Sequence, residues 1–202
     1  MEYIQISMLR PDMERVPRHP LPEGFTMRTY RQGDKATWVR IWREAEPFIK
    51  DISPATFDRE FGHDLPAMPK RCYFLVAPDG RDAGTASAWY DRRYAGKRWG
   101  VLHWVAVVPD FQGMGLAKPM VAFAMDRLRS LGHRRALLRT QTPRLGAIKV
   151  YLDFGFLPEI GSQEALRAWS LVRDALPHPV LAEALKAQTR RQRSVADEPT
   201  DE

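Results

Sequence analysis

The chain has 202 residues, of which 44% are hydrophobic and 28% charged, with a formal net charge of +6. This composition predicts a folded core and excludes a disordered chain, and the length suits one domain with extensions. There is no apolar run of the roughly 18 residues that a membrane span needs.

The N-terminal sequence and the cysteine content favour a cytoplasmic protein. The first fifteen residues lack the basic start, long apolar centre and small-residue cleavage site of a signal peptide. Cys72 is the only cysteine, which rules out an internal disulfide and is typical of a reducing compartment. We interpret Cys72 as a buried packing residue.

In chain order, the first half predicts strands interrupted by two helices. Alternating or β-branched stretches predict strands at 3–9, 24–30, 71–78, 83–93 and 100–108. Asp34 stands at the N-cap of a helix over 35–45, and Ser53 with Pro54 begins a second helix. The strand at 100–108 is apolar on both alternating faces, which predicts a central strand covered on both sides.

The second half alternates helices and strands and then becomes helical. The spacing predicts helices over 115–132 and 144–155, a strand over 134–140 and a short strand over 156–158. Amphipathic helices follow over 162–176 and 177–188. The predicted organisation is an extended segment 1–24, a domain 25–160, a helical extension 161–186 and a disordered tail 187–202.

The stretch HWVAVVPDFQGMGLAKPM, residues 103–120, runs a buried strand through a glycine turn into a helix. Such a turn exposes backbone N–H groups that can bind an anion at the helix start. A P-loop does not fit, because no Gly-Lys-Ser/Thr follows. A dinucleotide fingerprint does not fit either, because Lys118 occupies its third glycine position.

Two motifs in this region match a known family. The first, Gln-x-x-Gly-x-Ala between a strand and a helix, consists of Gln112, Gly115 and Ala117. The second lies thirty residues later and consists of Ala147, Tyr151, Gly155 and Phe156. With this element order, the chain resembles the GNAT superfamily of acyl-CoA-dependent N-acyltransferases from about residue 25 to 158.

The resemblance implies a fold and a cosubstrate. The expected fold is a mixed α/β (α+β), mostly antiparallel central sheet with helices on both faces, a splayed central parallel strand pair and an extra C-terminal helix. The implied cosubstrate is acetyl-CoA, whose pyrophosphate is expected at Gln112, Gly113, Met114, Gly115, Leu116, Ala117 and Lys118. The pantetheine arm is expected along the backbone of Val105, Ala106 and Val107, where one N–H group polarises the thioester carbonyl.

The resemblance also implies catalytic roles. Tyr151 matches the family tyrosine that donates a proton to the leaving thiolate, and the alternative is a packing residue on its helix. His103, two residues before Val105 and on the same face of the strand, is the candidate base, and a hydrogen-bonded core histidine is the alternative. The strand lacks the acidic residue that the family often places there.

The acceptor is a primary amine of an unidentified small molecule or peptide. Acidic and aromatic residues between the first two helices are candidates to attract and line it: Glu44, Glu46, Asp51, Phe48 and Phe57. No histidine has metal-ligand spacing, so no metal is expected.

The leading hypothesis is an acetyl-CoA-dependent N-acetyltransferase using direct transfer in a ternary complex. The alternatives are a non-catalytic acyl-CoA-binding sensor or regulator, and nucleic-acid binding through the basic surface, which no stacking-aromatic motif supports. The C-terminal helix and tail are candidates for a homodimer contact.

Overall fold

A computed structural model describes residues 1–196 and the side chains of residues 1–190. The chain divides into two compact units, one comprising Asp12–Ala136 and the other comprising Met1–Pro11 and the chain from Leu137. The predicted domain 25–160 therefore lacks residues 12–24 of the first unit and contains only part of the second.

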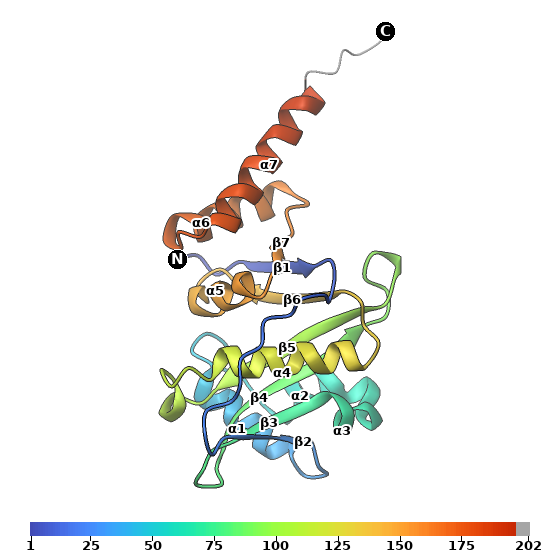
Figure 1. Cartoon of the computed structure of the whole chain (residues 1–202), viewed down its shortest axis with the longest axis vertical. Coiled ribbons are helices and arrows are strands. Elements are labelled where there is room, and N and C mark those ends of the chain that lie inside the picture. The colour runs from blue at the N-terminus through green and yellow to red at the C-terminus, as the bar shows by residue number, and fades with distance from the viewer. Residues whose placement is uncertain (197–202) are drawn as a thin grey trace. The chain divides into compact units, whose positions relative to one another are not determined.

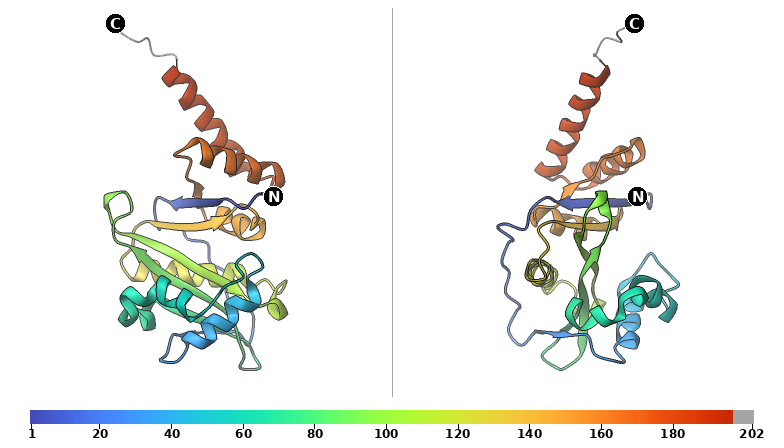
Figure 2. Two further views of the ribbon diagram at one scale, coloured as in Figure 1. Left: turned by 180° about the vertical axis from the view of Figure 1, so that it is seen from behind. Right: turned by 90° about the vertical axis from the view of Figure 1, so that its right-hand side faces the viewer.

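The unit Asp12–Ala136 contains four strands in the order β2-β3-β4-β5, each antiparallel to its neighbour. They are β2 (Thr26–Thr29), β3 (Cys72–Val76), β4 (Asp82–Asp91) and β5 (Trp99–Val107). The helices are α1 (Lys35–Ala45), α2 (Pro54–Phe61), α3 (Met68–Arg71) and α4 (Ala117–Ser130). Figure 2 shows α4 on one face of the strands and α1, α2 and α3 on the other, so both faces are covered as predicted.

The core of this unit lies on both sides of β3, β4 and β5. Between the sheet and the first two helices, Trp38, Phe57 and Phe61 are almost fully buried and pack edge to face. On the α4 face, Met120 and Leu128 are fully buried. Cys72 is fully buried, as predicted, and burial raises the pKa of its thiol to about 11, so it stays protonated.

The two helix starts differ in how they are capped. Ser53 begins α2 with Pro54 in the first turn, and the backbone N–H of Ser53 donates to the Thr56 hydroxyl at 3.1 Å. Asp34 precedes α1 but makes no capping bond with its side chain, contrary to the sequence prediction. Its carboxylate instead accepts from the Arg28 guanidinium at 2.6 Å, because β2 brings that cation close.

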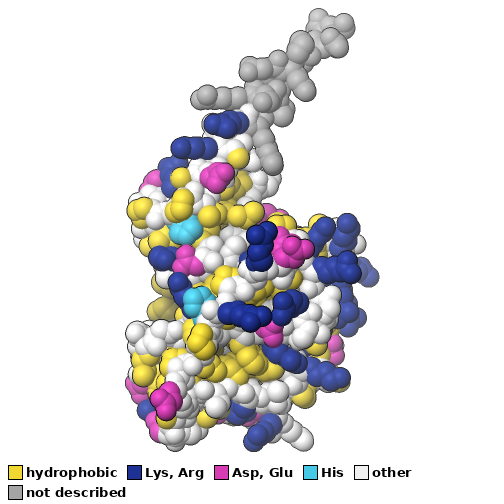
Figure 3. Space-filling model, in the orientation of Figure 1, with side chains coloured by type: hydrophobic (Ala, Val, Ile, Leu, Met, Phe, Trp, Pro, Cys, Tyr) yellow, Lys and Arg dark blue, Asp and Glu magenta, His cyan; other side chains and the backbone are white. Residues whose placement is uncertain are grey.

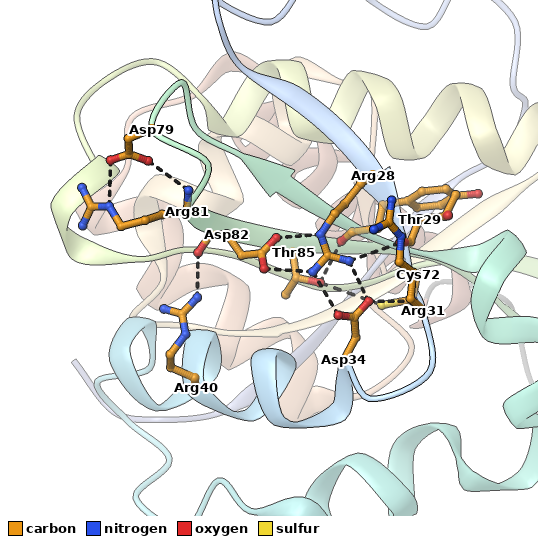
Figure 4. Close-up of polar contacts among 11 residues, drawn as sticks. Arg28, Thr29, Arg31, Asp34, Arg40, Cys72, Asp79, Arg81, Asp82 and Thr85 are labelled. Atoms are coloured by element: carbon orange, nitrogen blue, oxygen red, sulfur yellow. Dashed lines mark hydrogen bonds and ion pairs between the residues drawn. The ribbon is translucent and has the colours of Figure 1, made fainter.

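Arg28 ties three elements of this unit together (Figure 4). Its guanidinium donates to Asp34 before α1 and to Asp82 on β4, at 2.6 and 2.8 Å, and lies over the Phe74 ring at 4.4 Å. The hydrogen bonds and charges of the two carboxylates raise the pKa of Arg28, against the opposing effect of burial.

Arg28→Ala is expected to lower the free energy of unfolding by about 3 kcal/mol, because it leaves two partly buried carboxylates without their cation. Urea denaturation followed by tryptophan fluorescence measures the change. The control is Arg129→Ala, whose ion pair with Asp126 is exposed on both sides and is expected to contribute less than about 1 kcal/mol. Equal losses in the two variants would contradict a stabilising role of the Arg28 network.

The other unit contains three strands in the order β6-β1-β7. They are β1 (Gln5–Arg10), β6 (Ala136–Gln141) and β7 (Leu157–Pro158), and β7 runs antiparallel to β1. The first residue of β6, Ala136, belongs to the unit Asp12–Ala136. The helices are α5 (Leu145–Asp153), α6 (Gln163–Ala175) and α7 (Pro179–Ala196). The strand–helix–strand run β5, α4 and β6 is present as predicted (Figure 1).

The two C-terminal helices pack through a few large side chains. Trp169 of α6 is fully buried, and its indole N–H donates to the Glu159 carbonyl at 3.2 Å. Leu181 and Leu185 of α7 are buried as well. The predicted tail begins at residue 187, whereas α7 continues to Ala196, and residues 197–202 lie outside the described part of the chain. None of the described helices is long and apolar enough to cross a membrane.

Candidate functional site

The turn between β5 and α4 presents a row of backbone N–H groups. Gly113 and Gly115 have φ of +77° and +74°, which a side chain would strain. Within the described chain, the amides of residues 113–116 donate to no backbone or side-chain acceptor. Gln112, Gly113, Met114 and Gly115 are exposed, so this turn can accept an anion, as the sequence analysis predicts.

Neighbouring contacts hold the turn in place. The side-chain amide of Gln112 donates through Nε2 to the Val107 carbonyl at 2.9 Å, which links the turn to the end of β5. Phe111 is buried against the Phe25 ring, and Leu116 is buried at the start of α4. Ala117 is exposed and Lys118 partly exposed in the first turn of that helix, where the helix dipole adds partial positive charge.

A bulge interrupts β5 near the predicted base. Ser87 pairs with His103 and Thr85 pairs with Ala106, so Trp104 and Val105 together oppose one residue of β4. Trp104 has φ of +49°, which is strained for a residue other than glycine. The bulge shifts the alternation of side chains along β5, so the expectation that His103 and Val105 share a face is wrong.

The bulge brings two adjacent side chains to the same carboxylate. His103 Nε2 lies 3.4 Å from Glu60 Oε2 of α2, and Trp104 Nε1 donates to the same oxygen at 3.0 Å. The hydrogen bond with His103 lowers the pKa of Glu60 to about 2, against the opposing effect of burial, and the Trp104 indole lowers it further. Glu60 is therefore an anion at every pH of an ordinary assay.

Aromatic rings surround this carboxylate–imidazole pair. The Trp104 ring lies 4.5 Å from Trp42 and 4.9 Å from Trp38, both edge to face, and the Phe61 ring lies 5.6 Å from His103. His103 and Glu60 keep about a quarter of their side chains exposed, at 26% and 24%. The pair is thus accessible to a ligand but bordered by apolar surface.

Sequence reasoning missed Glu60. It named instead acidic residues near the end of α1, which the structure engages elsewhere: Glu44 pairs with Arg40 at 3.2 Å, and the Glu46 carboxylate accepts from the Phe48 amide at 2.7 Å. Phe57 is core rather than lining, at 1% exposed. The sequence signal that could have identified Glu60 is its place in the helix, because it precedes Phe61 on the buried side of an amphipathic helix.

The remaining predicted residues are placed as follows. Phe48 is exposed, and Asp51 accepts through its carbonyl from the Thr56 hydroxyl. Tyr151 lies on α5 in the other unit, partly exposed, with its ring 6.2 Å from Phe156. Burial raises the pKa of Tyr151 to about 12, opposed by the charge of Arg144.

The described residues contain no group of three or more His, Cys, Asp or Glu side chains that could hold a metal ion. The chemistry that this arrangement can perform is proton transfer at the His103–Glu60 pair.

Comparison with known proteins gives a family match over most of the folded chain. The family model described as the acetyltransferase (GNAT) family matches residues 36–156. A mycothiol acetyltransferase of Streptomyces griseus is 29% identical over 140 residues, which cover 67% of this chain and 44% of that protein. One of Actinosynnema mirum is 30% identical over 138 residues, covering 68% and 46%.

The chain thus spans less than half the length of these relatives. Among solved structures, a GCN5-related N-acetyltransferase from Sphaerobacter thermophilus superposes with a TM-score of 0.59 at 23% identity, covering 78% of this chain and 50% of that one. A glucosamine-6-phosphate N-acetyltransferase from Arabidopsis thaliana gives 0.50 at 20% identity, covering 69% and 95%. These likenesses confirm the predicted fold class.

Proposed function

Because the chain belongs to the acetyltransferase (GNAT) family, we propose that it transfers an acetyl group from acetyl-CoA to a primary amine by direct transfer. The observation that carries this proposal is the pairing of Glu60 with His103, which lies on the strand that leads into the glycine turn. The cytoplasmic location predicted from the sequence is part of the proposal.

The residues of the turn fit a coenzyme A pyrophosphate. Four consecutive amides, from Gly113 to Leu116, have no acceptor in the described chain, and the turn carries no side chain at two positions. Exposed N–H groups at a helix start are a common phosphate site. The backbone of Val105, Ala106 and Val107 is the proposed contact for the pantetheine arm.

His103 is the proposed base. When Nε2–H donates to Glu60, the neutral imidazole carries its lone pair on Nδ1, which can take a proton from the ammonium group of the acceptor. The neutral amine then forms a bond to the acetyl carbonyl carbon, and the carbon–sulfur bond breaks. Glu60 stabilises the imidazolium that results.

Tyr151 is the proposed acid. Its hydroxyl donates a proton to the leaving thiolate, the phenolate regains a proton from the nitrogen that has bonded to the acetyl carbon, and His103 returns its proton to solvent. The products are an N-acetyl amine and the free thiol of coenzyme A, and one proton from the ammonium group is released to solvent.

The acceptor is an amine that can approach Glu60 and the rings of Trp42 and Trp104. An anionic carboxylate among aromatic side chains favours a cation over a neutral molecule. The relatives from Streptomyces griseus and Actinosynnema mirum are named mycothiol acetyltransferases. We therefore propose a mycothiol-type amine as the leading candidate for the acceptor.

The test is free-thiol release from acetyl-CoA against a panel of amines that includes the desacetyl form of mycothiol, polyamines, amino acids and peptides. Release above the hydrolysis background with at least one amine supports the proposal. Silence across the panel, with coenzyme A still bound, favours a non-catalytic sensor instead.

Gly115→Ala is expected to weaken coenzyme A binding about tenfold, because a side chain at positive φ costs about 1–2 kcal/mol and distorts the amide row. Isothermal titration calorimetry measures the affinity. Gly80→Ala is the matched control, since Gly80 also has a positive φ, +84°, and open space around it, but lies in the β3–β4 turn. If Gly115→Ala binds coenzyme A as well as Gly80→Ala does, the turn is not the pyrophosphate site.

A further inference from the structure

A basic cavity lies at the other end of β5 from the glycine turn. It has a volume of about 350 Å³ and opens between the β4–β5 hairpin and the loop between α4 and β6. Its lining includes Lys97, Arg98, Trp99, His133, Arg134 and Arg135. The nine residues of β5 separate it from the turn after Val107 by roughly 25 Å along the strand.

The cavity carries four cations and no carboxylate in its lining. Among the described residues, none of Lys97, Arg98, Arg134 and Arg135 forms an ion pair with an acidic side chain. Arg98 and Arg135 lie over aromatic rings instead, at 5.0 Å from Tyr90 and 5.7 Å from Trp99. Figure 3 shows Lys and Arg side chains gathering over this hairpin.

The two loops that supply these cations are held close together. Gly100 donates its N–H to the Arg135 carbonyl at 3.0 Å, and a Cβ at Gly100 would lie 3.1 Å from His133. Gly132 has φ of +83° and ends α4, which turns the chain back toward β5. The backbone hydrogen bond therefore holds the two loops, and the four cationic residues that they carry, next to each other.

Buried groups beneath the cavity add no negative charge. Arg71 Nη1 lies 3.2 Å from His133 Nε2, so the arginine donates to a neutral imidazole. Burial, with the charges of Arg71 and Arg98, lowers the pKa of His133 to about 4. Burial and the charge of Arg98 also lower the pKa of Arg71. Arg71 and Arg98 both lie over the Tyr90 ring, at 4.8 and 5.0 Å, and the Tyr90 hydroxyl donates to the Asp64 carboxylate.

We propose that this cavity binds a small anion carrying a phosphate monoester or diphosphate group, separately from acetyl transfer. Guanidinium groups bind phosphate oxygens through paired N–H donors, and here three arginines and one lysine converge on a concave site from two loops. A single cavity of about 350 Å³ suits a compact anion, whereas a nucleic-acid backbone needs an extended track of cations.

Trp99 supplies a local reporter. It lines the cavity and is 7% exposed, and its indole N–H has no hydrogen-bond partner in the described chain. A bound anion is expected to move the indole resonance of this side chain in a ¹H–¹⁵N spectrum, with the peak assigned from Trp99→Phe.

The experiment titrates inorganic pyrophosphate into the protein saturated with coenzyme A, which occupies the proposed nucleotide site. We expect a one-to-one complex that shifts the Trp99 indole peak. Lys97→Gln/Arg134→Gln is expected to weaken it about tenfold or more, because one charged donor is lost from each loop. The control is Arg18→Gln/Arg31→Gln, which removes the same charge from outside the cavity and is expected to bind as the wild type does.

Each outcome decides the proposal. No binding of pyrophosphate, an unmoved Trp99 peak, or equal weakening in the two double variants overturns it. A 5′-phosphorylated single-stranded oligonucleotide that binds better than its 5′-hydroxyl form supports a phosphate monoester as the ligand group. Equal binding of the two oligonucleotides, tighter than pyrophosphate, overturns the proposal in favour of a nucleic-acid surface.

Discussion

Tyr151→Phe is expected to lower kcat for acetyl transfer by about 100-fold, the effect of losing a positioned general acid. The change removes one hydroxyl and keeps the ring, whose contact with Phe156 at 6.2 Å remains. Because burial raises the pKa of Tyr151 to about 12, the hydroxyl is protonated between pH 6 and 9, and the loss should be constant over that range. Thiol release under saturating amine measures it.

Coenzyme A affinity separates catalysis from binding in this variant. The dissociation constant from calorimetry should stay within about threefold of the wild type, since loss of the hydroxyl does not alter the amide row of the glycine turn. Tyr3→Phe, the same change at an exposed tyrosine of the same unit, is the control and should leave both quantities unchanged. A Tyr151→Phe enzyme with full thiol release would make Tyr151 a packing residue.

Glu60→Gln is expected to lower kcat/KM about 10- to 100-fold at pH 7, the usual effect of removing a group that orients a catalytic residue. Glutamine keeps an oxygen that can accept from Trp104 Nε1, which now lies 3.0 Å away, but it removes the charge next to His103. Glu60 is therefore tested as a positioning residue, and the fold around Trp104 is retained.

The pH dependence of kcat/KM is expected to change in a defined direction in the Glu60→Gln variant. With a pKa of about 2, Glu60 is ionised across the assay range and stabilises the protonated imidazole of His103. The Gln variant loses that stabilisation, so the acid limb of kcat/KM should move to lower pH while its maximum falls. A profile that falls uniformly without moving would indicate a structural role only.

A double-mutant cycle with His103→Gln completes the test. The two changes should be far from additive, because the carboxylate acts through the imidazole. Glu44→Gln is the control for general loss of negative charge, since Glu44 is exposed and paired with Arg40. Additive losses at positions 60 and 103 would contradict the proposed pair.

Local signals in the sequence were enough for most helices and strands. Ser53 and Pro54 begin α2 as predicted, and Gly132 and Gly155, both at positive φ, end helices where expected. These signals succeed because capping and left-handed turns depend on a few adjacent residues. The two spaced motifs were also local, and they led to the family that the match over residues 36–156 confirms.

Residues that meet only through folding were not predictable in the same way. Asp34 has the right type and position for a cap, yet the Arg28 guanidinium from β2 takes its carboxylate. The alternation along β5 fails at Trp104, because a bulge depends on the register with β4 and not on the strand's own sequence.

The sequence by itself determined the order of the strands and of the longer helices, the glycine turn and the acetyltransferase family, since each rests on residues a few positions apart within its own segment. Only the tertiary structure decided that Glu60, forty-three positions before His103, is the carboxylate beside that histidine. It also decided that four cations from two separate loops share one cavity. Both depend on how helices and loops pack against β5, which periodicity and spacing do not encode.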